Sequence, residues 1–263
     1  MRKAALVLAT TAAFMAVTAG TAGASHSWND YHWARTANPL GLTIVDTTTP
    51  VWTSYVNTAV ADWEKSKVLA LTKTTGTTRR DCDPLLGQVK VCANWWGFNN
   101  WLGLATIWID PNHHIVQGKA EFNDTWFSTA TYNTSAWRHL VVCQEIAHDF
   151  GLDHQDETFN NPNLGTCIDY TNDPDGGPGG ASETDPSNEH PNRHDYEQLV
   201  TIYTHLDSYS TALAVAAANP GLASNKRATP VATVRNDHIA YSVVTDRFAD
   251  GSAKVTRIDW ALR

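Results

Sequence analysis

The amino-acid sequence predicts an α+β fold, because alternating and helical hydrophobic patterns both occur and occupy separate segments. Two amphipathic helices are expected to pack on a sheet, and a third helix and a β-hairpin follow near the C-terminus. The chain has 263 residues, 11 of them Trp. It is therefore long enough to bury a sizeable core.

The N-terminal 24 residues have the pattern of a secretory signal peptide. Arg2 and Lys3 precede an apolar run that ends near Val17, and Ala22-Gly23-Ala24 offers a small-residue cleavage site. A short buried helix is the alternative for this run. No later segment approaches the roughly 18 apolar residues that a membrane helix needs. We therefore expect a secreted, extracellular protein that does not enter the membrane, and we expect it to be a monomer.

The charge of the chain is acidic. The 19 Lys and Arg residues face 27 Asp and Glu residues, which gives a net charge of −8 that becomes −10 without Arg2 and Lys3. Such a chain is a poor candidate for binding nucleic acid or an anionic membrane.

Four cysteines in an exported chain predict two disulfides. The short loop between them favours a Cys82–Cys92 pair, which leaves Cys143–Cys167. Free buried thiols are the alternative.

The first half of the chain carries strand and helix patterns in turn. Alternation over residues 28–45 predicts one or two strands, and apolar residues at helical spacing predict a helix from Val51 to about Ser66, with Pro50 in its first turn. The segment from Thr74 to Asn100 carries turn residues and the short disulfide loop. Its final "NWWGFNNW" is expected to close an edge of the core, with carbohydrate binding as the alternative.

Two further strands, "LGLATIWID" and "HIVQGKAEFND", are expected on either side of a turn at residues 111–114. His113 and His114 are adjacent at this turn. We expect them to be solvated there, and a metal site is the alternative.

A second helix is expected from about Ser135 to Phe150, and it carries an unusual inward-facing glutamine. Gln144 shares one helix face with Leu140 and His148, because residues four apart lie one above the other. A buried glutamine amide needs hydrogen-bond partners or a metal ion.

The C-terminal third divides in two. "HPNRHDYEQLVTIYTHL" has helical spacing and predicts a third helix, and the Ala/Ser/Asn-rich residues from about 207 to 228 resemble a linker. Two alternating runs around Asp250-Gly251 predict a hairpin. We therefore expect a main domain over residues 25–208, followed by a linker and hairpin extension over residues 209–263.

"QEIAHDFGLDH", residues 144–154, resembles the metzincin zinc-peptidase signature H-E-x-x-H-x-x-G-x-x-H. Glu145, His148, Gly151 and His154 match it, and Gln144 replaces the first histidine. The resemblance covers about residues 28–206. It implies a mixed, twisted sheet with two long helices, a cleft over the active-site helix and a C-terminal helix, all within a catalytic domain at residues 25–208.

The resemblance implies one catalytic zinc ion. Positions 144 and 148 lie on one helix face, and the chain doubles back at Gly151, so Gln144, His148 and His154 are the expected ligands. An amide oxygen is a weaker ligand than an imidazole nitrogen. His190 or His194 is the alternative to Gln144.

Two residues near the metal are expected to act in catalysis. Glu145 would be the general base for the attacking water. Tyr170 would ligate the metal or donate a hydrogen bond to the oxyanion, with a purely structural tyrosine as the alternative. Ile168 stands where the family has a methionine beneath the metal, and it can supply the same apolar floor.

The expected function is a secreted zinc endopeptidase acting on a protein or peptide substrate, which would pair with the strand "HIVQGKAEF". The alternative is a secreted, non-catalytic binding protein that retains the fold. The first strand begins close to the predicted cleavage site and leaves no room for an inhibitory N-terminal segment, so any latency would have to come from elsewhere, for example from the C-terminal extension. The acidic, Gly-rich residues 173–189 would form a flexible wall of the cleft or hold a structural calcium ion.

Overall fold

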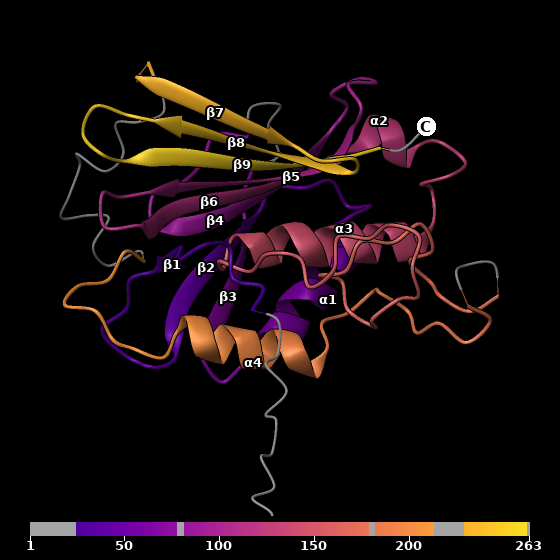
Figure 1. Ribbon diagram of the computed structural model, residues 1–263, viewed down its shortest axis with the longest axis horizontal. Coiled ribbons are helices and arrows are strands. Elements are labelled where there is room, and N and C mark those ends of the chain that lie inside the picture. The colour runs from indigo at the N-terminus through magenta and orange to yellow at the C-terminus, as the bar shows by residue number, and fades with distance from the viewer. Residues whose placement is uncertain (1–24, 78–81, 179–181, 213–228, 262–263) are drawn as a thin grey trace, which may run out of the picture.

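The computed structural model is a mixed α+β protein with one large sheet, and it describes residues 25–77, 82–178, 182–212 and 229–261 (Figure 1). The predicted signal peptide and most of the predicted linker lie outside these residues. Within the described ranges, no helix is long and apolar enough to cross a membrane.

The sheet contains nine strands in the described part of the chain. These are β1 (His32–Trp33), β2 (Leu40–Asp46), β3 (Leu69–Thr75), β4 (Gln88–Asn94), β5 (Trp101–Ile109), β6 (His114–Asn123), β7 (Ala232–Asp237), β8 (Tyr241–Arg247) and β9 (Ala253–Trp260). Their order is β3-β2-β4-β6-β5-β9-β8-β7, and β1 also pairs with β6. The strands from β3 to β6 in this order are parallel, whereas β5, β9, β8 and β7 each run antiparallel to the strand before them.

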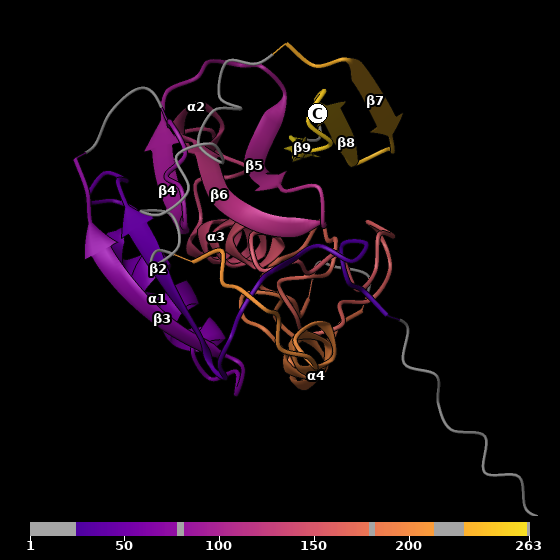
Figure 2. The ribbon, with the colours of Figure 1, turned by 90° about the vertical axis from the view of Figure 1, so that its left-hand side faces the viewer.

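The helices are α1 (Thr53–Trp63), α2 (Asp124–Phe127), α3 (Ser135–His148) and α4 (Arg193–Ile202). Helices α1 and α3 contact each other and pack on the same side of the sheet, α1 against β2 and β3 and α3 against β5 and β6 (Figure 2). The indole of Trp63 fixes this pair, because its Nε1 donates a hydrogen bond to the Cys143 carbonyl at 3.1 Å. Helix α4 lies below α3, farther from the sheet.

A single large apolar cluster lies between the sheet and the helices, as the composition predicted. Its largest fully buried apolar side chains are Trp33, Trp52, Trp63, Tyr203, Phe122, Phe127 and Phe150. The aromatic residues therefore supply the bulkiest side chains of a core that also contains many Leu, Ile and Val residues.

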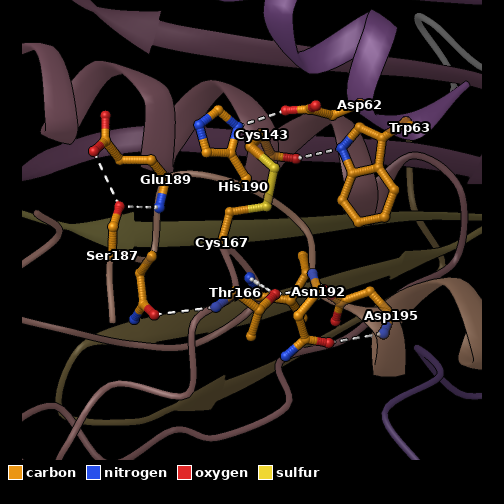
Figure 3. Close-up of a disulfide and its surroundings, with 12 residues drawn as sticks. Asp62, Trp63, Cys143, Thr166, Cys167, Ser187, Glu189, His190, Asn192 and Asp195 are labelled. Atoms are coloured by element: carbon orange, nitrogen blue, oxygen red, sulfur yellow. Dashed lines mark hydrogen bonds and ion pairs between the residues drawn. A yellow bond between two sulfur atoms is a disulfide. The ribbon is translucent and has the colours of Figure 1, made fainter. Parts of the chain in front are cut away.

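Both predicted disulfides are confirmed. Cys143–Cys167 joins α3 to the turn that ends at Tyr170, and Figure 3 shows it beside the indole of Trp63. The same view shows Asn192, the N-cap residue of α4, whose side chain accepts a hydrogen bond from the backbone N–H of Asp195.

Two local predictions were wrong. The segment from Thr74 to Asn100, expected to be turns, contains β4, a central strand with Val89, Val91 and Cys92 buried. A parallel strand covered on both faces has no polar alternation, so its pattern resembles neither a surface strand nor a helix. Pro50 lies in the turn before α1, not in its first turn, since the helix begins at Thr53.

The prediction that "HIVQGKAEF" pairs with a substrate was also wrong. β6, which contains "HIVQGKAEF", pairs with β4 on one side and β5 on the other, so neither edge can accept a peptide. The predicted hairpin around Gly251 is confirmed as β8 and β9. However, β9 pairs with β5 from Ala253 to Trp260. The extension therefore continues the main sheet and occupies the edge of β5 opposite β6.

Candidate functional site

Helix α3 and the turn after it bring the motif residues together. The helix is capped by Thr134, whose hydroxyl accepts the Trp137 N–H at 3.2 Å, and it runs from Ser135 to His148. Gly151 then has a φ of +92°, and a Cβ at this position would lie 2.1 Å from the Tyr31 carbonyl oxygen. Only glycine fits there, and the turn returns the chain so that His154 faces His148.

The two motif histidines are buried and directed at each other, with their Nε2 atoms 3.2 Å apart. His148 donates its Nδ1–H to the Leu152 carbonyl at 2.8 Å, which leaves its Nε2 lone pair free. Burial lowers the pKa of both imidazoles, and the guanidinium of Arg257 lowers both further. Neutral imidazoles are the form that binds metal ions.

Arg257 and Asp259 enter this site from β9. The guanidinium of Arg257 lies 2.6 Å from Nδ1 of His154 and forms an ion pair with Asp153. It also lies over the ring of Tyr241, 3.9 Å from the ring centre. The Asp259 carboxylate joins His148 and His154 in a group whose potential ligand atoms all lie within 4.8 Å of one another. The sequence had assigned no role to either residue.

Glu145 is completely buried and faces the Asp259 carboxylate. Neither carboxylate oxygen of Glu145 accepts a hydrogen bond from a donor in the described residues, and Oδ2 of Asp259 is likewise unpartnered. Burial, reinforced by the nearby Asp259 carboxylate, raises the pKa of Glu145 well above its usual range. Two carboxyl groups so placed favour one shared proton over two negative charges.

A glycine in β5 makes room for Glu145. A Cβ at Gly103 would lie 2.1 Å from Oε1 of Glu145 and 2.7 Å from its carboxyl carbon. The strand backbone therefore lies directly against the carboxylate, and any side chain at this position would displace it.

Tyr170 is buried beside His154, with the two ring centres 4.3 Å apart. Its hydroxyl donates to the Asp259 carboxylate and lies 3.2 Å from the Ala240 carbonyl. Burial raises the pKa of Tyr170 well above its usual value, with Asp259 acting in the same direction. Both hydroxyl contacts are therefore to the C-terminal segment. Ile168 is fully buried in the turn below the histidines.

Gln144 is buried on the same face of α3, as its spacing predicted. It borders a pocket whose wall also includes Leu102, Leu140, Tyr170, Asp259 and Trp260. Among the described residues its amide has no hydrogen-bond partner. The amide is thus able to bind a ligand, and residue 144 lies one helical turn before His148.

The other predicted histidine ligands lie elsewhere. His190 contacts Asp62, with 2.6 Å between Nδ1 and Oδ2, and His194 stacks on His26. The expectation of a solvated His113-His114 pair holds only for His113, whose side chain is 50% exposed, whereas that of His114 is 12% exposed.

A metal ion fits the donor set of the α3 site. Two imidazole nitrogens bound to one tetrahedral zinc ion at 2.0–2.1 Å lie about 3.3 Å apart, close to the separation observed between His148 and His154. The facing carboxyl groups of Glu145 and Asp259 share a proton in place of any other donor among the described residues, and a buried cation would compensate their charge instead.

No protein-family model matches the chain, and no curated protein matches it.

Proposed function

We propose that this protein is a secreted zinc-dependent endopeptidase of the metzincin type whose active site is closed by its own C-terminal strand. The observation that carries the proposal is the buried pair of Nε2 atoms of His148 and His154, 3.2 Å apart, on the helix and turn that also position Glu145. A zinc peptidase requires a metal, a base and a place for an extended substrate. Each has a counterpart among the described residues.

His148 and His154 would hold the zinc ion. Binding would require the guanidinium of Arg257 to leave Nδ1 of His154, so that the proton of this imidazole can lie on Nδ1 and the Nε2 lone pair is free. Asp259 would then be the third donor while β9 stays in place, because it is the carboxylate that groups with both histidines. Gln144 would take its place once β9 moves away. Zinc would supply Lewis acidity toward the scissile carbonyl and the attacking water.

Glu145 is the proposed general base, and Tyr170 is the proposed donor to the oxyanion. In the closed form neither is available. Glu145 faces a second carboxyl group that favours its protonated state, and the Tyr170 hydroxyl donates to Asp259. Release of Asp259 would return the proton acceptor and the hydroxyl donor to the site.

The substrate would occupy the edge of β5 that now pairs with β9. β9 forms an antiparallel ladder along β5 from Trp101 to Ile109. An extended peptide could form the same backbone hydrogen bonds, since strand addition depends on the main chain. β9 thus stands where the substrate is expected, and this arrangement favours a latent enzyme.

A non-catalytic binding protein is the second candidate, and the Arg257–His154 contact favours it. A guanidinium can only donate, so Nδ1 of His154 accepts from Arg257. The proton of neutral His154 then lies on Nε2, and this N–H donates to Nε2 of His148. His148 in turn donates to Leu152. This chain of hydrogen bonds is complete without a metal ion.

The test combines metal content with hydrolysis of a mixed peptide library. Elemental analysis of the secreted protein is expected to give zinc, and Asp259→Asn is expected to release chelator-sensitive peptidase activity. Adding Glu145→Gln to Asp259→Asn should abolish that activity while zinc is retained. A zinc-loaded Asp259→Asn protein that cuts no peptide would contradict the proposal and favour the binding protein.

A further inference from the structure

A second group of histidines gathers where β1, the start of β6 and the chain after α4 meet. His32 and His114 are direct partners in the parallel β1–β6 pairing, which places their side chains side by side. The chain leaves α4 at Ile202 and brings His205 and Asp207 to the same point. None of these residues belongs to the α3 motif.

The potential ligand atoms converge on one carboxylate oxygen. Oδ1 of Asp207 lies 3.4 Å from Nε2 of His114, 3.3 Å from Nε2 of His205 and 3.9 Å from Nε2 of His32. The Nε2 atoms of His32 and His205 are 3.2 Å apart. Ligands of a tetrahedral zinc ion with bonds of 2.0–2.1 Å are separated by about 3.3 Å, so most of these distances already suit one ion.

His32 and His114 are the two least exposed histidines of this group and are called the inner histidines. Their Nδ1 atoms, which face away from Asp207, are held by other partners. His32 donates its Nδ1–H to the Asp30 carbonyl at 2.8 Å, and a carbonyl can only accept, so the lone pair of this imidazole is on Nε2. Nδ1 of His114 lies 2.5 Å from the Tyr209 hydroxyl, which donates in turn to Asp110 at 2.6 Å. A second partner at Nδ1 that fixes ring and tautomer is typical of metal-binding histidines.

Asp207 is oriented in the same way. Its Oδ2 accepts the Arg35 N–H at 2.8 Å, and its own N–H donates to the Arg35 carbonyl at 2.7 Å. Oδ1 is thereby directed at the histidines. The side chains of His32, His114 and Asp207 are 12%, 12% and 10% exposed, so the three form a largely dehydrated, preorganised group.

We propose that His32, His114 and Asp207 form a second metal site, structural in role and selective for zinc, with His205 as the fourth ligand. The side chain of His205 is 53% exposed and can adjust to complete a tetrahedron. A surface pocket lined by Asp30, His32, Thr204 and His205 gives the ion access. Bound zinc would join the N-terminal strand to the chain that follows α4. The proposal does not depend on peptidase activity.

The protonation of the inner histidines is compatible with this role. Burial lowers the pKa of His32, and His114 and His205 act in the same direction. The hydrogen bond to Asp110 raises the pKa of His114, so metal and proton compete for that residue.

The experiment counts zinc ions by calorimetric titration of the secreted, chelator-treated protein. His114→Ala/Asp207→Asn is expected to bind one zinc ion fewer than the wild type. At zinc concentrations near 100 Kd it should lose a Tm increase of about 5–10 °C that the wild type displays. His148→Ala changes the α3 site instead. If the α3 site binds no zinc, this variant binds as many ions as the wild type, whereas if the second site binds none, it is the double variant that binds as many as the wild type.

Two further variants keep the test decisive if the double variant does not fold. His205→Ala changes an exposed side chain and should weaken zinc binding at least tenfold. His113→Ala is the matched control, because among the described residues the ring of this neighbour interacts with Asp30 and Tyr31 and not with the four proposed ligands, so zinc binding should be unchanged. Equal zinc counts and affinities in the wild type and in His205→Ala would overturn the proposal.

Discussion

The guanidinium of Arg257 lies 2.6 Å from Nδ1 of His154, so the last strand of the chain is hydrogen-bonded to the last histidine of the α3 motif. Arg257 is 1% exposed, and it is compensated by Asp153 and Glu157. Asp259, two residues further along β9, faces Glu145 and Tyr170. Arg257 and Asp259, which alternate along β9, therefore contact three of the residues with a proposed role in catalysis, namely His154, Glu145 and Tyr170.

Opening this contact is expected to raise activity. Asp259→Asn removes the carboxylate that accepts from Tyr170 and raises the pKa of Glu145. Losing these contacts should weaken the hold of β9 on the site and let it leave the edge of β5, so peptide hydrolysis should rise roughly tenfold or more above the wild type. Thr256→Ala is the control, because Thr256 points to the other face of β9 and contacts Thr106. The measurement is the initial rate on a quenched peptide library. Equal rates for Asp259→Asn and Thr256→Ala would contradict the closed-site interpretation.

Gly103→Ala should displace Glu145. The added Cβ would meet the carboxylate at 2.1 Å, and overpacking of this kind costs about 1–3 kcal/mol. Denaturant unfolding should detect the loss of stability, and Gly103→Ala combined with Asp259→Asn should lose the activity that Asp259→Asn gains. Gly41→Ala in β2 is the matched control, because no atom lies within 4 Å of its added Cβ. Similar stabilities for the two alanine variants would refute this account of Gly103.

The two disulfides should differ in what their removal does to the proposed zinc site on α3. Replacing Cys143 and Cys167 by Ala removes a link across 24 residues and is expected to cost roughly 3 kcal/mol of unfolding free energy. It also frees the turn below His148, so zinc affinity at the α3 site should fall. Replacing Cys82 and Cys92 by Ala should destabilise the protein by a similar amount and leave zinc affinity unchanged. The two paired variants would be compared by calorimetry, and equal zinc affinities would argue against the proposed link.

Asp169 predicts a pH dependence of stability. Burial raises its pKa to about 6, although the Leu164 N–H and the Asn188 amide donate to its Oδ2. Because the folded-state pKa lies above the unfolded value, the folded state binds more protons between the two. Stability from this group is complete below about pH 4 and is lost as pH rises toward 6.

Asp169→Asn keeps an oxygen acceptor and removes this titration. Its unfolding free energy at pH 7 should exceed that of the wild type by about 1–3 kcal/mol, and the difference should vanish near pH 4. Denaturant unfolding at several pH values measures both quantities. A constant difference across this range would rule out the assignment to Asp169.

Local features of the site could be predicted from the sequence. The four-residue spacing of Gln144 and His148 places both on one helix face, and the glycine at position 151 allows the turn that returns His154. Helical period and glycine conformation are properties of a few consecutive residues, so no long-range information is needed. The hairpin at Gly251 and the Cys82–Cys92 disulfide were predicted for similarly local reasons, and the Cys143–Cys167 disulfide followed by elimination.

Alternation along β9 indicated a strand but not its neighbour. The pattern is the same whichever edge the strand joins, because side-chain period two specifies a face and not a partner. The same limit explains why β6 was mistaken for the strand that receives substrate. His114 was mistaken for a solvated turn residue, because its partner in β1 lies more than 80 positions away.

By itself, then, the sequence determined the inward face of α3, the turn at Gly151 and the chemistry that His148, His154 and Glu145 can perform. Only the tertiary structure decided that Arg257 contacts His154, that Asp259 contacts Tyr170, and that His32, His114 and Asp207 meet. The physical reason is the range of the interactions. Helices and turns follow from neighbours along the chain, whereas both sites depend on strand pairing and burial among segments about 80 to 170 residues apart, which the packing of the whole core selects.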